Sequence, residues 1–444
     1  MAAANGNMVV QALKCPVCGA QVKPYARECE YCGTALVIVS VGAAQSQTAD
    51  SPALTDSLAK WREVLAHDPN NAAANYALGV AFLHQGLRDA ALAYLQRATQ
   101  AAPEVAVYHY NYALALFNDG EEMGLDQMNT VSTEIDYASR LDPNFPEARA
   151  FRQFFAACAL RPANPKGAAA ALEAAVQVCP DIGIFYAWLG ACYADMENYT
   201  AARPACRKAI ELDPRLGEPH ITLSAMAYET GNVDEGMQWA SKAIALFRTP
   251  IYQAFAIYHL GVGYEEKKDY ATAEQHYHRA LELSPQFGNV YRHLCLVCCM
   301  TRRPDEGIKY GHRALELATS SQAKAAANDS LGLCYHQLGN HAAAEKSFRE
   351  AVAVNPKLGQ AYDHLCSLYY AWKKYDKGIE YGQKAVELIK SPPEDLALAY
   401  NDLGMCLWGK GQREQAAQML QKAAAINPHN PGFQANLQAI QQKR

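Results

Sequence analysis

Proline recurs along this chain at intervals that only a few kinds of fold can accommodate. Pro69 and Pro103 are 34 residues apart, as are Pro180 and Pro214, and further intervals of 71 residues lead to Pro285 and then to Pro356. A proline ends a preceding helix because it lacks the N–H donor and clashes with the turn before it. A fixed period of this length indicates stacked structural units rather than one globular core. The full series, usually after Asp, Asn or Ser, is Pro69, Pro103, Pro143, Pro180, Pro214, Pro285, Pro356 and Pro428.

A second pattern lies between these prolines: Leu-Gly, in most copies an aromatic residue three positions later, and then small residues on a second helix. It begins at Leu78-Gly79, Leu189-Gly190, Leu260-Gly261, Leu331-Gly332 and Leu403-Gly404. Small residues let two helices approach closely, while aromatic side chains fill the grooves between them. The pattern resembles the tetratricopeptide repeat family over roughly residues 55–444. The resemblance implies an all-α fold, a right-handed superhelix (α-solenoid) of about ten helical hairpins.

The C-terminal half contains a longer repeat. Residues 288–295 return 71 positions later as residues 359–366, with the same Gly, Tyr and His-Leu-Cys, and a weaker first copy begins at Gly217. We therefore predict three 71-residue double-hairpin copies within residues 217–429, and a C-terminal capping helix over residues 430–444. Every second hairpin is expected to have a longer second helix or connection, near residues 247–251, 319–324 and 389–395.

Near the N-terminus, four cysteines form two CxxCG turns: Cys15, Cys18, Cys29 and Cys32. In each turn two thiolates can converge on one ion, and the glycine after the second cysteine permits the positive φ of a tight turn. Four thiolates complete a tetrahedral site and leave no position for a catalytic water. The sequence therefore predicts one structural Zn²⁺ ion held by these four cysteines.

This segment resembles the short zinc-ribbon family of bacterial multidomain proteins over residues 13–36, with a departure at Glu28, where an aromatic residue is common in that family. We expect a zinc ribbon over residues 13–41, an Ala/Gln/Ser/Thr-rich linker over residues 42–54 and the solenoid over residues 55–429. A ribbon of this size is expected to dock on protein or to cap the array. Contact with nucleic acid is the alternative, because three cations lie close by: Lys14, Lys23 and Arg27.

The resemblance to the tetratricopeptide repeat family also implies where a partner would bind. In that family the first helix of each hairpin, helix A, lines the concave surface, chiefly through its second, fifth, ninth and twelfth positions. Aromatic residues at the fifth position suit a partner peptide or helical segment with apolar anchors, and the row becomes polar and acidic toward the C-terminus. The alternative for each tyrosine is packing between neighbouring hairpins. The candidate groove residues are Tyr76, Tyr110, Tyr258, Arg292, Asp329, Asp363 and Asn401.

Composition narrows the classes of function. The formal net charge of −5 is spread over both signs, so there is no basic stripe to neutralise phosphates, and bulk nucleic-acid binding is disfavoured. The first residues contain no basic cluster before an apolar run, and no stretch approaches about 18 apolar residues, so neither a secretory signal nor a membrane span is expected. Ten of the 14 cysteines lie in helical segments as small apolar residues. This usage suits a reducing compartment, and we expect a cytoplasmic protein.

Two groups of residues could be mistaken for chemical sites. Cys295, Cys298 and Cys299 fall on one helix, where core packing explains them. His293 and His364 return with the duplicated unit, and we expect them to line the groove through hydrogen bonds. No GxSxG, phosphate-binding glycine loop or HExxH motif occurs. The sequence therefore predicts a non-enzymatic protein–protein interaction scaffold, with a nucleic-acid-associated factor as the alternative.

Overall fold

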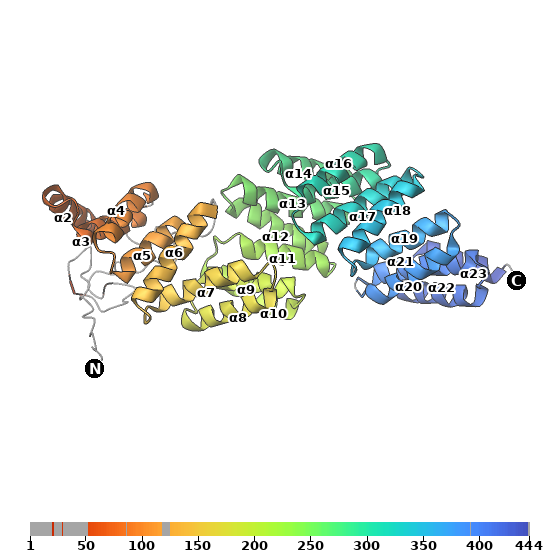
Figure 1. The fold of residues 1–444 in the computed structure, drawn as a ribbon, viewed down its shortest axis with the longest axis horizontal. Helices are drawn as coiled ribbons and strands as arrows, with labels where there is room; N and C mark the ends of the chain where they lie inside the picture. Colours follow the sequence, from red (N-terminus) through yellow and green to blue (C-terminus); the bar gives the residue numbers. More distant parts are fainter. Residues whose placement is uncertain are drawn as a thin grey trace, which may run out of the picture. The chain divides into compact units, whose positions relative to one another are not determined.

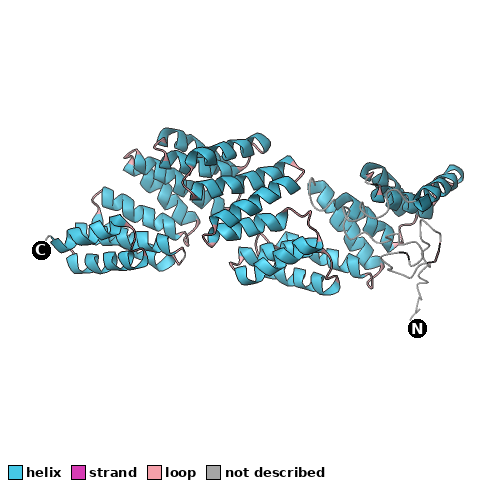
Figure 2. Cartoon of the chain, turned by 180° about the vertical axis from the view of Figure 1, so that it is seen from behind, coloured by secondary structure: helices cyan, strands magenta, loops and turns pink. Residues whose placement is uncertain are grey.

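The computed structural model describes residues 52–85, 87–117, 125–390 and 392–442, together with Ala20, Gln21 and Cys29. Every regular element in these ranges is an α-helix (Figure 2), and the ranges contain 22 helices. Within the described ranges, consecutive helices pack into nine hairpins, each consisting of a helix A and a helix B (Figure 1). Helix α2 (Pro52–His67) precedes the first hairpin and α23 (Pro431–Gln442) follows the last. The predicted all-α repeat fold is confirmed.

The helices group into two compact units. The N-terminal unit extends to Met226 and includes Leu246–Thr249, whereas the C-terminal unit comprises Ala227–Ala245 and the chain from Pro250 onward. The four hairpins of the N-terminal unit are α3 (Ala72–His84) with α4 (Arg88–Ala101), α5 (Ala106–Phe117) with α6 (Leu125–Leu141), α7 (Pro146–Leu160) with α8 (Pro165–Val178), and α9 (Gly183–Asp195) with α10 (Tyr199–Leu212). The division between the units falls at the next two helices, α11 (Glu218–Glu229) and α12 (Val233–Leu246).

The C-terminal unit continues with five further hairpins. They are α13 (Pro250–Glu266) with α14 (Tyr270–Leu283), α15 (Gly288–Met300) with α16 (Pro304–Leu317), α17 (Ser321–Gln337) with α18 (His341–Val354), α19 (Gly359–Ala371) with α20 (Tyr375–Leu388), and α21 (Pro393–Gly409) with α22 (Arg413–Ile426).

Helix A, not helix B, absorbs the extra length of each 71-residue copy. Helix B has 14 residues in all five of these hairpins. In contrast, α13, α17 and α21 have 17 residues, whereas α15 and α19 have 13. The expectation of a longer helix B or connection is therefore corrected to one additional turn at the start of helix A. Strong start signals explain it: Pro250 and Pro393 are first helical residues, and the Ser320 side chain accepts a hydrogen bond from the Ala323 N–H.

Glycine in helix A allows the helix B of the same hairpin to pack closely against it. A Cβ atom at Gly332 would lie 2.5 Å from Cε1 of Phe348, and one at Gly261 would lie 2.6 Å from Cε1 of Tyr277. Both rings are fully buried. The ring of helix B thus occupies the space that the missing side chain leaves, which is the physical reason for the Leu-Gly pattern.

In the described part of the chain, seven of the turns between consecutive helices contain a residue in the left-handed region. In this region the Cβ of an L-residue crowds the following carbonyl, at a cost of roughly 1–2 kcal/mol. Glycine avoids that cost in three of these turns, at Gly231, Gly339 and Gly411. The other four turns place a charged residue there with φ between 57° and 61°: Glu197, Lys268, Arg302 and Lys373.

Aromatic rings dominate the core of the N-terminal unit. Phe117 on α5 meets three rings of α7 edge to face, with centroid distances of 5.4–6.2 Å to Phe151, Phe154 and Phe155. Phe185 on α9 lies 4.9 Å from Phe151. Edge-to-face pairs at these distances add to the stabilisation by burial. The cluster connects three successive A helices into one core.

Candidate partner-binding surface

Five residues at the fifth position of helix A lie on successive hairpins of the C-terminal unit. They are Tyr258 on α13, Arg292 on α15, Asp329 on α17, Asp363 on α19 and Asn401 on α21. We call this row the helix A face. Four of the side chains are half-buried, and Asp363 is 9% exposed. The row changes from an aromatic and a basic residue to acidic and amide side chains within one unit.

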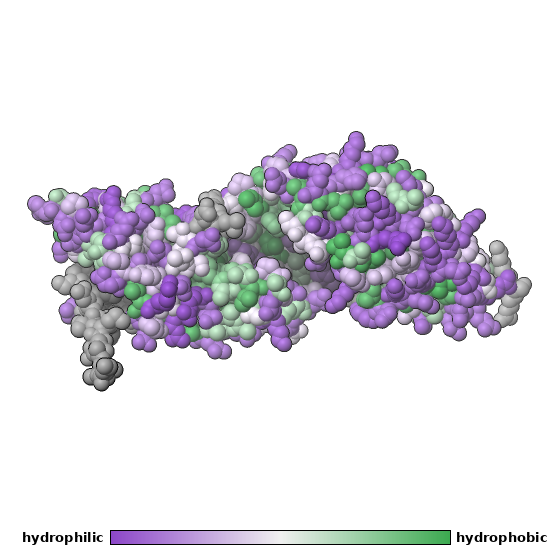
Figure 3. Space-filling view, in the orientation of Figure 1, coloured by the Kyte–Doolittle hydropathy of each residue, from purple (hydrophilic) through white to green (hydrophobic). Residues whose placement is uncertain are grey.

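Apolar side chains are exposed at the second position of two of these helices. Phe255 on α13 is 40% exposed and Leu398 on α21 is 45% exposed. Elsewhere the surface of the C-terminal unit is mostly hydrophilic on the side drawn in Figure 3, with apolar residues in small separate patches. Single exposed apolar residues beside a polar row are suited to anchoring a partner segment rather than to burying a whole domain.

Polar contacts between neighbouring A helices repeat with a separation of 35 residues. In each pair, the second residue lies on the next helix A of the array or on α23, and it contacts the fifth-position residue of the hairpin before it. Polar groups at this depth are stable only when they are hydrogen-bonded. The pairs are Tyr258 with His293 (2.9 Å), Asp329 with His364 (2.7 Å), Asn401 with Asn436 (2.9 Å) and, in the N-terminal unit, Tyr76 with Asn111 (2.6 Å).

The first of these histidines belongs to a buried cluster in which it is neutral. His293 Nδ1 lies 2.9 Å from Glu265 Oε2, and the Tyr277 hydroxyl donates to the same oxygen at 2.5 Å. Burial and the neighbouring Arg292 lower the pKa of His293. Burial alone would raise the pKa of Glu265, but His293 and Tyr277 lower it. The contacts fit an imidazole that donates from Nδ1 to an ionised Glu265 and accepts at Nε2 from the Tyr258 hydroxyl.

The second histidine, one copy later, is in the opposite charge state. Burial alone would lower the pKa of His364, but Asp329, with smaller effects from Asp363 and Asp402, raises it to about 9. Burial and then Asp402 raise the pKa of Asp363 to about 8. Asp402 lies next to Asn401, whose amide donates to its Oδ1 at 3.0 Å. This end of the helix A face therefore contains several carboxyl groups around one imidazolium.

A pocket with a volume of about 320 Å³ lies at the other end of the helix A face. Phe255 and Phe287 form one apolar wall, with ring centroids 4.4 Å apart. Arg292 and Asn289 contribute polar groups, and Ala327 on α17 contributes an opposing surface. The pocket can accept one apolar side chain of a partner, with hydrogen-bonding groups at its edge.

Two predicted groove residues in the N-terminal unit are buried. Tyr110 has no exposed surface and packs against Phe145 and Phe151, with ring centroids 4.8 and 6.0 Å away. Tyr76 is buried, stacks on Tyr108 at 4.6 Å and accepts the Asn111 hydrogen bond. Packing between hairpins, the alternative for these tyrosines, explains both. We therefore correct the expectation that Tyr76 and Tyr110 offer a surface to a partner.

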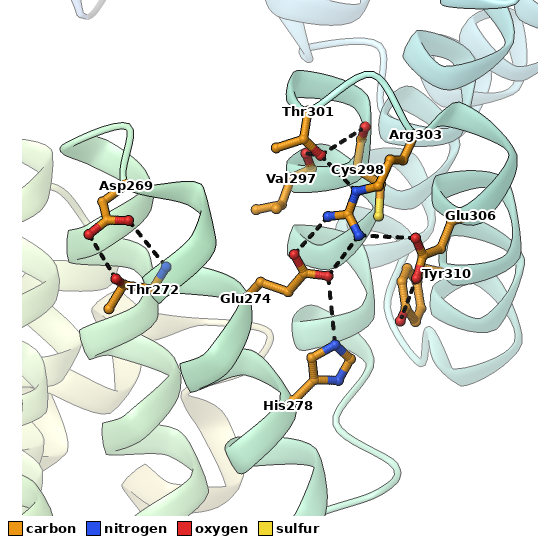
Figure 4. A network of polar contacts seen from close by, with 10 residues as sticks. All are labelled: Asp269, Thr272, Glu274, His278, Val297, Cys298, Thr301, Arg303, Glu306 and Tyr310. Carbon is orange, nitrogen blue, oxygen red and sulfur yellow. Dashed lines mark hydrogen bonds and ion pairs between the residues drawn. The ribbon is translucent and has the colours of Figure 1, made fainter.

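A polar network around Arg303 fastens the α13–α14 hairpin to the α15–α16 hairpin (Figure 4). The Arg303 guanidinium donates to Glu274 Oε2 at 2.7 Å and to Glu306 Oε2 at 3.1 Å, while its Nε donates to the Thr301 hydroxyl. The hydrogen bond to Glu274 raises the pKa of Arg303. His278 Nε2 lies 3.8 Å from Glu274 on the same helix (Figure 4). Side chains that hold each other in this way have a structural role.

The cysteines of the duplicated unit are core residues, as predicted for Cys295 and Cys298. Cys295 Sγ lies 3.5 Å from Cys334 Sγ, and Cys366 Sγ lies 3.6 Å from Cys406 Sγ in the next copy. The hydrogen bond with Cys295 and burial raise the pKa of Cys334, which keeps the thiol protonated. All four are buried thiols in contact with a neighbouring hairpin. Neither pair has the thiolate character of a reactive site.

Of the four predicted zinc ligands, only Cys29 belongs to the described residues, and its side chain is buried. Cys15, Cys18 and Cys32 lie outside the described residues, as do most of the predicted ribbon and linker. The chemistry of the donor set, four thiols in two CxxC pairs, fits a zinc ion. The assignment of these four residues as ligands stays a prediction.

Several residues of the surface were not found from the sequence. Asp402, Asn436 and Glu265 lie at positions that the fifth-position rule does not select. A comparison of residues 35 positions apart would have detected the Asn401–Asn436 pair, because that separation already relates His364 to Asp329. Glu265 contacts His293 at a different separation, so only the fold brings them together.

Comparison with known proteins agrees with this architecture. Models of the tetratricopeptide repeat match residues 54–106, 185–216, 254–287, 286–357 and 358–428, more than half of the chain. A model of the zinc-ribbon domain matches residues 14–36, which include all four cysteines of the two CxxC turns. The chain belongs to the tetratricopeptide repeat family, with an N-terminal zinc ribbon. The last two tetratricopeptide matches coincide with the pairs of hairpins α15–α18 and α19–α22.

Individual similar proteins are distant. "Tetratricopeptide repeat protein 6" of Homo sapiens is 21% identical over 189 residues, which are 42% of this chain and 35% of that protein, so the match spans about a third of the relative. The structure titled "Crystal structure of APC/C hetero-tetramer Cut9-Hcn1" superposes with a TM-score of 0.57 at 13% identity, over 91% of this chain and 92% of the other. A tetratricopeptide repeat protein from Parabacteroides merdae ATCC 43184 has a TM-score of 0.43 at 15% identity, over 57% and 96% of the two chains. The Cut9-Hcn1 structure shows the shared fold alone.

No helix within the described ranges combines the length and the apolar character needed to cross a lipid bilayer. The fold and the family are those of a protein-interaction scaffold.

Proposed function

We propose that this chain is a non-enzymatic scaffold whose helix A face binds a peptide or helical segment of a protein partner, while the N-terminal zinc ribbon docks a second component or caps the array. The observation that carries this proposal is the pocket beside Phe255 and Arg292. Arg292 lines this pocket and also belongs to the row of fifth-position residues that ends at Asn401. We further propose that one structural Zn²⁺ ion is bound by Cys15, Cys18, Cys29 and Cys32, and that the protein acts in a reducing compartment such as the cytoplasm.

Site-specific photo-cross-linking tests the binding surface. The cross-linking residue p-benzoylphenylalanine would replace Phe255 or Leu398, the exposed second-position residues of helix A. A matched control replaces Val354, which is 39% exposed at the end of a helix B. We expect the two helix A positions to cross-link to the same partner in native lysate and position 354 to give no such product. Equal cross-linking from all three positions would contradict a binding site on helix A.

The role of the zinc ribbon needs a separate comparison. Partners captured by the full-length chain would be compared with those captured by a variant lacking residues 1–40. We expect the variant to retain the partner of the helix A face and to lose a second component. Capture of the same partners in the same amounts would leave the ribbon with a capping role only.

A further inference from the structure

Four carboxyl groups gather at the C-terminal end of the helix A face. Asp329 comes from α17, Asp363 from α19, and Asp395 and Asp402 from α21. Asp329 contacts His364, the residue after Asp363, and Asp395 contacts Gln360 on the same helix α19. Each of the other three carboxylates also raises the pKa of Asp363. Three successive hairpins therefore bring negative charge together at one place.

The positive charge available to these groups is small. His364 Nδ1 lies 2.7 Å from Asp329 Oδ1, so its charge is already paired with that carboxylate. Asp402 accepts a hydrogen bond from Asn401, and Asp395 accepts one from Gln360 at 3.2 Å, but both donors are neutral amides. Among the described residues, no lysine or arginine forms an ion pair with Asp363, Asp395 or Asp402. One imidazolium therefore faces four carboxyl groups.

Asp363 is the member of the group with a buried carboxyl oxygen that lacks a hydrogen-bond partner in the described part of the chain. The residue is more than nine-tenths buried, and this oxygen is Oδ1. A buried carboxylate without a partner is costly, so the group must either retain a proton or gain a cation. Burial and the adjacent Asp402 raise its pKa to about 8, so the free protein keeps the proton near neutral pH.

We propose that Asp363 and Asp402, with Asp329 and Asp395 around them, bind the guanidinium or ammonium group of a basic side chain in the partner segment. This proposal rests on the proposed function and names the chemistry of one part of the partner. The basic group replaces the proton on Asp363 and pairs with Asp402, while the amide side chains of Gln360 and Asn401 hold the flanking carboxylates in place. A guanidinium suits the site best because its planar fork can donate to two carboxylates at once.

A basic side chain fits this site better than a bare metal ion does. No three His, Cys, Asp or Glu side chains in the described residues are arranged to hold a metal ion. The carboxyl groups also come from helices that already carry the second- and fifth-position residues of the face, so a segment anchored near Phe255 runs toward them along successive hairpins. The partner segment is therefore expected to combine an apolar anchor with a basic residue farther along.

Selection from a displayed random 12-residue peptide library tests the proposal on the full-length chain. We expect peptides selected on the wild type to contain Arg or Lys at a fixed position, and the D363N and D402N variants to lose that preference. Asp305→Asn is the matched control, because it makes the same change at an exposed position on a helix B. Wild-type peptides without a preferred basic residue would overturn this proposal and leave the proposed function intact, whereas selection of no peptide at all would overturn both.

Calorimetry with one selected peptide then measures the site directly. Replacing its basic residue by citrulline, a neutral analogue of arginine, should weaken binding at least tenfold, and D363N should cause a similar loss, whereas D305N should bind as the wild type does. Because a cation displaces the Asp363 proton, binding at pH 7 should release protons in the wild type but not in D363N. Circular dichroism confirms that each variant is folded. Unchanged affinity and proton release in both D363N and D402N, or tight binding of Mg²⁺ or Ca²⁺ alone that displaces the peptide, would refute the proposal.

Discussion

His364 Nδ1 lies 2.7 Å from Asp329 Oδ1, across the boundary between two hairpins, whereas the corresponding atom of His293 lies 2.9 Å from Glu265 in the preceding copy. The two histidines occupy the same position of a duplicated unit, yet their pKa values are shifted in opposite directions. Burial dominates at His293, and the surrounding carboxylates dominate at His364. One duplicated position has thus acquired two electrostatic environments.

We expect the thermal midpoint of the C-terminal unit to fall as the pH rises from about 6.5 to 9. The pKa of His364 in the folded chain, about 9, exceeds its ordinary value of 6.5, so the folded state retains a proton that the unfolded state has released. The free energy of unfolding must then decrease as the pH rises through this range. Asp363, whose pKa is raised from 3.8 to about 8, acts in the same direction from lower pH.

Variants separate the contributions of Asp363 and His364 to this pH dependence of stability. D363N should remove the part of the stability loss that develops below about pH 8, and H364Q added to D363N should reduce the remaining slope up to about pH 9. In the D363N background, H293Q is the control, because a histidine with a lowered pKa changes stability only below its ordinary pKa. Melting curves followed by circular dichroism between pH 6 and 10 give the measurement, and an unaltered slope in D363N/H364Q would contradict the assigned charge states.

Gly332→Ala should destabilise the chain by about 1–3 kcal/mol, because the new Cβ would lie 2.5 Å from the buried Phe348 ring and force overpacking. Urea denaturation measures the loss. If the close approach is the cause, F348L in the same chain should recover part of the stability, since it removes the ring that the methyl group meets. A double variant as unstable as the sum of both single changes would assign the effect to something other than this contact.

Lys373→Gly should stabilise the chain by roughly 1 kcal/mol or less. Lys373 is an exposed residue with φ 57°, so glycine relieves a left-handed conformation that is unfavourable for residues with a Cβ, although it also adds freedom to the unfolded chain. Gly411→Lys, at the corresponding turn with φ 88°, is the reciprocal change and should destabilise. Thermal midpoints of the two variants moving in the same direction would be incompatible with this reasoning.

Zinc content should depend on the CxxC cysteines and on no cysteine of the helices. We expect one equivalent of zinc in the purified chain and none in a C15S/C18S variant, measured by elemental analysis, with the helical circular dichroism signal nearly unchanged. Cys158→Ser, which alters a half-buried thiol on α7, should retain the metal. Zinc that survives loss of both Cys15 and Cys18 would exclude the proposed ligand set.

Local patterns predicted the fold well because each hairpin depends on short-range rules. The Leu-Gly pair at Gly332 and the ring at Phe348 are 16 residues apart, so their contact is visible in the repeat itself. The extra turn at the start of α17 was misplaced because a serine cap and a loop residue look alike until the hydrogen bond of Ser320 is seen.

The candidate surface was harder to predict than the fold. A rule for the fifth position located Asp363 but could not reveal that this carboxyl is buried, because burial depends on how α19 packs between its neighbours. The same rule selected Tyr110, whose side chain is buried in the aromatic core of the N-terminal unit. The charge states of His293 and His364 depend on burial, on residues of other helices such as Asp329, and on the differing neighbours Arg292 and Asp363. The shared His-Leu-Cys motif alone therefore could not predict the difference.

The same kinds of contact recur at both ends of each 71-residue copy, so whole copies could be added or removed. If α15–α18 were lost as one block, α19 would follow α14, and His364 would meet Tyr258 where His293 does now, while the Cys366–Cys406 contact would be untouched. Recombination between copies could therefore shorten or extend the chain while keeping both the tyrosine–histidine contact and the thiol contact at the junction. The duplication would then be a means of adjusting the reach of the binding surface over evolutionary time, one pair of hairpins at a step.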